Sequence, residues 1–73
     1  MAKQNVESEV AGNVWKIEVS VGDQVRVGDV LMILESMKME IPVESPVAGR
    51  VVELCVQAEQ PIEEGQTVAV VEA

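Results

Sequence analysis

The sequence predicts an all-β protein, folded as a flattened barrel or sandwich of short strands. Valine accounts for 16 of the 73 residues and isoleucine for four, and branching at Cβ favours strands over helices. No window shows a sustained helical period. The chain also repeats itself, and turn signals divide each half into about four short strands, a pattern typical of sandwiches and barrels.

The repeat appears when the chain is laid on itself with a shift of 37 residues and no gap. Val6–Gly12 then matches Val43–Gly49 at six of seven positions, and the longer segments 6–36 and 43–73 match at ten of 31. We therefore expect a single domain, residues 1–73, whose halves form two interlocked sets of strands about an approximate two-fold axis.

Turn signals place the strands of the first half. We expect them at Asn5–Val10, Val14–Ser20, Gln24–Arg26 and Val30–Ser36, separated by breaks that each contain a glycine. From Trp15 to Val21 the odd-numbered residues are all apolar. Alternation of this kind points one set of side chains inward, so Trp15 is expected in the core.

The stretch Glu35–Pro42 joins the two halves and holds one of only three lysines, Lys38. Since the repeat ends at Ser36 and again at the chain end, this stretch is expected at the pole opposite both termini. A two-residue turn at Met37-Lys38 would place Ser36 opposite Met39 and Glu35 opposite Glu40. Such a hairpin turn would hold two non-glycine residues at positive φ, which has a cost.

Composition excludes several kinds of active site. The chain has no histidine and a single cysteine, Cys55, so a Ser/His/Asp triad, a Cys/His pair and a His-rich metal site are ruled out. One cysteine forms no internal disulfide, which fits a reducing compartment, and we expect a cytoplasmic protein. The net charge of −8 argues against nucleic acid. Neither a signal peptide nor a membrane-spanning stretch is expected.

Taken by itself, Lys38 is an amine nucleophile on a flexible stem. A solvated lysine amine is almost entirely protonated at neutral pH, and no base lies nearby in the sequence, so Lys38 would be a poor catalyst. It would be a good acceptor if a second enzyme activated the incoming group. From the residues alone, an ordinary solvated turn lysine is an equally good interpretation.

The stretch Glu35-Ser36-Met37-Lys38-Met39-Glu40 closely resembles the attachment motif of biotinyl domains, where a lysine lies between two methionines. Flanking matches are Ala11–Trp15 and Val21–Asp23 before it, and Gly49–Val51 and Glu64-Gly65 after it, so the resemblance covers about residues 6–71. It implies a flattened β-barrel of two four-stranded sheets with Lys38 on a hairpin tip.

The resemblance further implies that a biotin protein ligase attaches biotin to Lys38 in amide linkage. The biotin ring would then receive a carboxyl group at a biotin carboxylase site and deliver it at a carboxyltransferase site. The chain would be a carrier without catalytic residues. Met37 and Met39 are implied as recognition elements, and Glu35 as a further ligase contact, although a solvated acidic rim explains Glu35 and Glu40 equally well.

Two alternatives stay open. Lipoate could replace biotin on the same architecture, although lipoyl domains usually have Asp where Met37 stands, or the chain could be an unmodified docking module. The sequence also departs from the family pattern, because Glu59-Gln60-Pro61 stands where the first half has Gly22-Asp23-Gln24. This departure predicts a loop of altered shape. Cys55 corresponds to Glu18 in the repeat and is expected to face solvent.

Overall fold

The structure is a computed structural model that describes residues 2–73, and within these residues it contains eight β-strands and no helix. The strands are β1 (Lys3–Glu7), β2 (Gly12–Ile17), β3 (Gln24–Val25), β4 (Val30–Ser36), β5 (Met39–Glu44), β6 (Gly49–Leu54), β7 (Pro61–Ile62) and β8 (Thr67–Glu72). They form two antiparallel four-stranded sheets, which confirms the predicted fold class.

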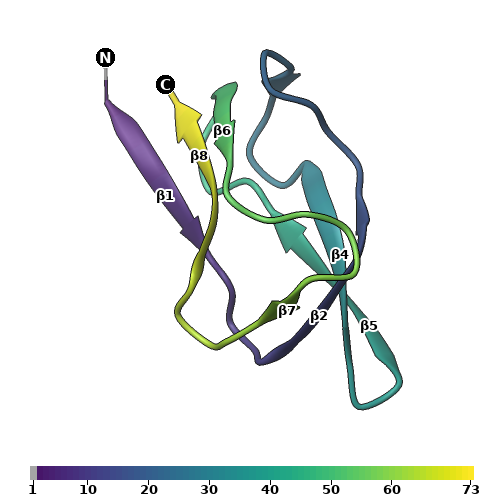
Figure 1. Ribbon diagram of the computed structural model, residues 1–73. Helices are drawn as coiled ribbons and strands as arrows, with labels where there is room; N and C mark the ends of the chain where they lie inside the picture. The colour runs from purple at the N-terminus through teal and green to yellow at the C-terminus, as the bar shows by residue number, and fades with distance from the viewer. Residues whose placement is uncertain (1) are drawn as a thin grey trace.

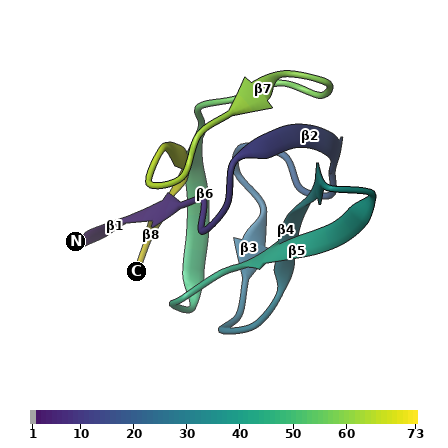
Figure 2. The ribbon, with the colours of Figure 1, turned by 90° about the horizontal axis from the view of Figure 1, so that it is seen from below.

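The order of the strands carries the two-fold repeat. One sheet has the order β1-β8-β6-β3 and the other β5-β4-β2-β7. The repeat makes β1 the counterpart of β5, β2 of β6, β3 of β7 and β4 of β8. Replacing each strand by its counterpart turns the first order into the second. Each sheet therefore combines strands from both halves of the sequence, as the prediction of two interlocked sets required, and Figure 2 shows the two sheets facing each other.

The two poles of the molecule differ in what they carry. Figure 1 shows both chain ends together at the top and the turn between β4 and β5 at the bottom. The Ala73 amide donates to the Ala2 carbonyl at 2.9 Å, so the ends lie side by side. The molecule measures 36 × 18 × 18 Å, and the β4–β5 turn is at the pole opposite the termini, as predicted.

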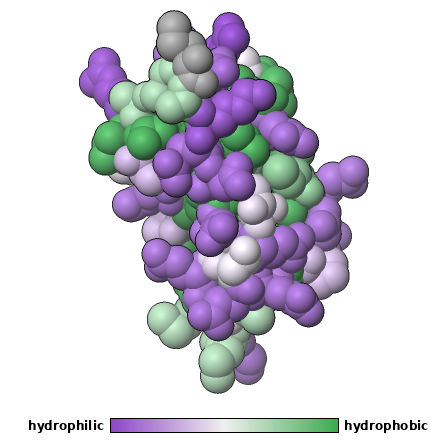
Figure 3. Space-filling model, turned by 90° about the vertical axis from the view of Figure 1, so that its left-hand side faces the viewer, coloured by the Kyte–Doolittle hydropathy of each residue, from purple (hydrophilic) through white to green (hydrophobic). Residues whose placement is uncertain are grey.

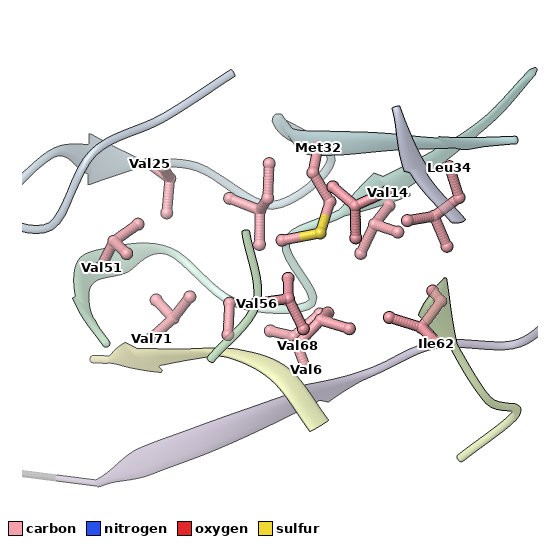
Figure 4. Packing of buried hydrophobic residues seen from close by; sticks show 13 residues of the cluster. Val6, Val14, Val25, Met32, Leu34, Val51, Val56, Ile62, Val68 and Val71 are labelled. Carbon is pink, nitrogen blue, oxygen red and sulfur yellow. The ribbon is translucent and has the colours of Figure 1, made fainter. Parts of the chain in front are cut away.

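The core lies between the two sheets and consists almost wholly of aliphatic side chains (Figure 4). Val14, Leu31, Met32 and Leu34 come from one sheet, and Val51, Val68 and Val71 from the other; all are buried to 1% exposure or less. Burial of each such side chain contributes about 1.5–3 kcal/mol. The apolar residues of this short chain are thus used mainly to pack the two sheets against each other.

The expectation that Trp15 is buried is wrong, because β2 contains a bulge. Val14 pairs with Leu34 and Lys16 with Ile33, so Trp15 is an extra residue with no partner on β4. A bulge of this kind breaks the alternation of side chains. Val14 is consequently fully buried, while Trp15 is 48% exposed.

Three predicted strands are longer than the observed ones, and the shortest of them, β3, ends at Val25 rather than Arg26. The first ends at Glu7 rather than Val10, because the buried Ser8 hydroxyl donates to the Val10 carbonyl at 2.5 Å and turns the chain. Its counterpart Ser45 makes the same bond to Val47 at 2.6 Å. The second strand begins at Gly12 and ends at Ile17, instead of running from Val14 to Ser20, so Val21 lies in a loop and is exposed.

The loop that holds Glu59 keeps the backbone of its counterpart, contrary to the expectation of an altered shape. The Gly22 amide donates to the Val51 carbonyl at 2.7 Å, and the Glu59 amide donates to the Val14 carbonyl at 2.6 Å. Gly22 has φ 100° and Glu59 has φ 68°. Glu59 thus takes a left-handed conformation that normally favours glycine.

Candidate functional site

The turn at Met37-Lys38 has the geometry that the sequence predicts. Ser36 pairs with Met39 and Glu35 with Glu40, which leaves two residues in the turn. Met37 has φ 53° and Lys38 has φ 63°, and a two-residue hairpin of type I′ requires positive φ at both positions. Each non-glycine residue held there costs on the order of 1–3 kcal/mol, so turn stability is not what selected these side chains.

The side chains of the turn are among the most exposed in the molecule. Met37 is 91% exposed and Met39 is 63% exposed, and Lys38 between them is exposed as well. Most of the face shown in Figure 3 is hydrophilic, and apolar atoms reach the surface mainly toward the two ends, including the bottom where the β4–β5 turn lies. Large apolar side chains held in water favour contact with a partner.

Lys38 itself is unengaged in the part of the chain that the structure describes. The single ion pair found among residues 2–73 joins Lys16 and Glu18 at 3.5 Å, and no hydrogen bond of Lys38 is present there. The amine therefore has no neighbouring group that would activate it as a catalyst. The amine is exposed and therefore accessible to another molecule.

Sequence reasoning missed the two residues that fix the base of this hairpin. Gly12 on β2 lies so close to β4 that a Cβ there would overlap the Glu35 carbonyl. The Ser36 hydroxyl donates to the Ala11 carbonyl at 2.9 Å. Gly12 could have been found, because Gly49 in the second half makes the same close approach to the Glu72 carbonyl. No signal in the sequence indicates the Ser36 bond.

The structure brings only some of the predicted residues together. Met37, Lys38 and Met39 share the tip, whereas Glu35 and Glu40 face each other one pair behind the Ser36–Met39 pair, and both are exposed. The carboxylates of Glu35 and Glu40 lie on the outer face of the sheet. Their like charges do not stabilise the hairpin.

Cys55 lies outside this site. It is a free, exposed thiol, as expected from its correspondence with Glu18. Partial burial raises the pKa of the Cys55 thiol, and the nearby charge of Glu53 raises it further. A raised pKa lowers the thiolate fraction and with it the reactivity of the Cys55 thiol.

In residues 2–73, no helix is long and apolar enough to cross a membrane.

Comparison with known proteins shows which family this chain resembles. The profile of the family described as "Biotin-requiring enzyme" matches residues 4–71. The "Biotinylated protein TB7.3 homolog" of Mycobacterium leprae is 46% identical over 68 residues, which cover 93% of this chain and 96% of that protein. The "Biotin/lipoyl attachment protein" of Bacillus subtilis is 49% identical over 49 residues, 67% of each chain.

Larger proteins contain similar segments. The urea amidolyase of Saccharomyces cerevisiae is 37% identical over 67 residues, 92% of this chain and 4% of that protein. The crystal structure of the Kluyveromyces lactis urea carboxylase superposes with a TM-score of 0.93 at 33% identity, over 99% of this chain and 6% of that one. The chain thus spans nearly all of the mycobacterial relative and a small part of these enzymes.

Proposed function

The chain belongs to the family of biotin-requiring attachment domains, and from this premise we propose that Lys38 is the residue that carries the biotin. The chain is a biotin carboxyl carrier domain, and such domains are modules of biotin-dependent carboxylases. The observation that supports Lys38 most directly is its position on an exposed, strained turn at the pole opposite the chain ends.

Attachment requires a biotin protein ligase. The free amine of Lys38 attacks the carboxyl carbon of biotin, which the ligase presents as an activated acyl ester. The C–N bond of the amide forms, the activating group leaves with the electron pair of its C–O bond, and a base of the ligase takes one amine proton. Lys38 supplies only the nucleophile, in keeping with the lack of an activating neighbour among residues 2–73.

The attached biotin would serve as a long arm on a rigid tip. Its ring would accept a carboxyl group at the biotin carboxylase and deliver it to an acceptor at the carboxyltransferase. A tethered group reaches both sites at a high effective concentration. The domain itself would then catalyse neither step, and its aliphatic core would hold the hairpin in place.

Lipoate is the second candidate group for Lys38. The Bacillus subtilis relative is named for both biotin and lipoyl attachment, although Met37 stands where lipoyl domains usually have Asp. The other alternative, an unmodified docking module, predicts that neither group is attached.

The test is intact-mass measurement after co-expression with a biotin ligase or with a lipoyl ligase. We expect the mass gain of one biotin, its loss in Lys38→Arg, and its retention in the matched Lys16→Arg variant, whose lysine is also exposed. A mass gain only from the lipoyl ligase would reassign the cofactor. A gain that persists in Lys38→Arg would overturn the site, and no gain from either ligase would leave the docking module.

A further inference from the structure

The two halves share a backbone but differ in surface chemistry around Trp15. The repeat gives each surface position a counterpart, and the exposed Trp15 on β2 corresponds to Val52 on β6. In the same way Asn13 corresponds to Arg50, and Glu59 to Gly22. The fold needs no indole at this position, since β6 has the same bulge at Val52.

These three unmatched residues, Asn13, Trp15 and Glu59, line one open groove together with Val14 and Glu35, which the repeat retains. Asn13, Val14, Trp15, Glu35 and Glu59 surround a volume of about 280 Å³ on the sheet that carries the hairpin. Asn13 pairs with Glu35 in the β2–β4 ladder, and Glu35 lies one pair behind the Ser36–Met39 pair that closes the Met37-Lys38 turn. The Trp15 groove therefore lies at the base of the Lys38 hairpin.

The chemistry of the Trp15 groove fits a cationic side chain with a flat face. The indole is half-exposed, and the exposed carboxylates of Glu35 and Glu59 flank it in a chain of net charge −8. Arginine stacks on an indole face and pairs with carboxylates at the same time. A neutral or acidic partner surface would gain little from this combination.

The reach of Lys38 decides which partner brings that side chain. A lysine stem of four methylenes extends the amine only about 6 Å from its Cα, because the five bonds from Cα to Nζ zigzag. The enzyme that acylates the bare amine must close around the hairpin, so its surface meets the flanks of the tip. A carboxylase that receives the longer biotinyl arm can stay farther from the domain.

We propose that the Trp15 groove receives an arginine side chain of the biotin protein ligase during attachment. This inference rests on the proposed function, because it concerns the enzyme that modifies Lys38. Met37 and Met39 would contact the ligase at the tip, and the Trp15 groove would contact it on one side of the hairpin. The one-sided contact would set the orientation in which Lys38 enters the active site.

The first test compares the Trp15→Val variant with the wild-type chain as substrates of a purified biotin protein ligase. The quantity measured is kcat/KM of biotinylation. This variant places at position 15 the residue that the second half has at position 52, so the fold is retained. Loss of a central indole from an interface predicts that kcat/KM falls by about tenfold or more. The matched control Val52→Trp adds an indole to the other half and should leave the rate unchanged.

Glu59 provides a second test in which stability and recognition move in opposite directions. Glu59→Gly removes a carboxylate from the Trp15 groove but relieves the positive φ of this residue. We expect a higher thermal midpoint together with a slower biotinylation. Glu59→Gln keeps the backbone strain, and we expect it to slow biotinylation equally and to weaken its dependence on salt.

The outcomes separate this inference from the proposed function. If the wild-type chain gains no biotin, the proposed function fails and the inference fails with it. If the wild-type chain is biotinylated and Trp15→Val or Glu59→Gln reacts at the same rate, only the Trp15 groove is overturned. An equal loss in Val52→Trp would also overturn it, because the effect would then not depend on position.

Discussion

At the scale of single residues, Met37, Lys38 and Glu59 hold a left-handed backbone at φ 53°, 63° and 68°. Each would be more stable as glycine or asparagine. Two of the three form the tip, and the third lines the Trp15 groove. Strained positions of this kind persist where the side chain serves a function, which supports the proposals for the tip and for the groove.

The turn can be tested by giving it the residues that its conformation favours. Met37→Asn with Lys38→Gly places Asn-Gly in a type I′ turn. We expect the free energy of unfolding to rise by about 1–2 kcal/mol, measured by denaturant titration, and biotinylation to be lost. Stability and modification would thus be opposed at the same two residues.

Lys38→Arg is the matched control for that experiment, because it removes the acceptor amine and keeps a long charged side chain at positive φ. Its unfolding free energy should stay within about 0.5 kcal/mol of the wild type. If the Asn-Gly variant were no more stable than Lys38→Arg, the turn would carry no strain.

At the scale of elements, the close contacts of Gly12 and Gly49 hold one strand of each sheet against its neighbour. Gly12 meets the Glu35 carbonyl on β4, and Gly49 meets the Glu72 carbonyl on β8. The first contact lies at the base of the Lys38 hairpin, and the second lies at the pole of the chain ends. Under the proposed function, the close contact of Gly12 would support recognition of the hairpin, whereas that of Gly49 would support folding alone.

Alanine at each glycine tests this division. Gly12→Ala and Gly49→Ala should each lower the free energy of unfolding by about 2–3 kcal/mol, since the added Cβ forces the strands apart. Biotinylation should slow only in Gly12→Ala, where the hairpin base moves. The neighbouring Asn13→Ala adds no overlap and should change stability by less than about 0.5 kcal/mol. Equal slowing in both glycine variants would contradict the assignment.

The elements also show what the sequence could predict and what it could not. Glycine and valine patterns locate β3 and β4, because turns and β-branched runs are local signals. The bulge at Trp15 depends instead on how β2 meets β4 across the sheet, and alternation along one strand carries no information about that pairing. The end of β1 at Glu7 was also missed, because it is set by a local hydrogen bond from the Ser8 hydroxyl to the Val10 carbonyl.

At the scale of the whole molecule, symmetry made the position of the tip predictable. A gapless shift of 37 residues maps the Ser36–Met39 pair of the hairpin onto Ala73 and Ala2 at the chain ends. The Ala73 amide bonds to the Ala2 carbonyl at 2.9 Å, so the ends form the counterpart of the hairpin without its turn. Long-range pairing could be inferred here because one half of the chain reports on the other.

This correspondence makes the ends a place where a second turn can be built. Joining Ala73 to Ala2 through Asn-Gly would close the chain with a type I′ turn, copying the backbone of Met37-Lys38 with residues suited to it. Closure removes conformational entropy from the unfolded chain, so the cyclic protein should be more stable by about 2–4 kcal/mol. A linear chain with Asn-Gly appended is the control. A thermal midpoint equal to that of the control would show that the ends do not meet as a hairpin, whereas biotinylation at the distant Lys38 should be unaffected by closure.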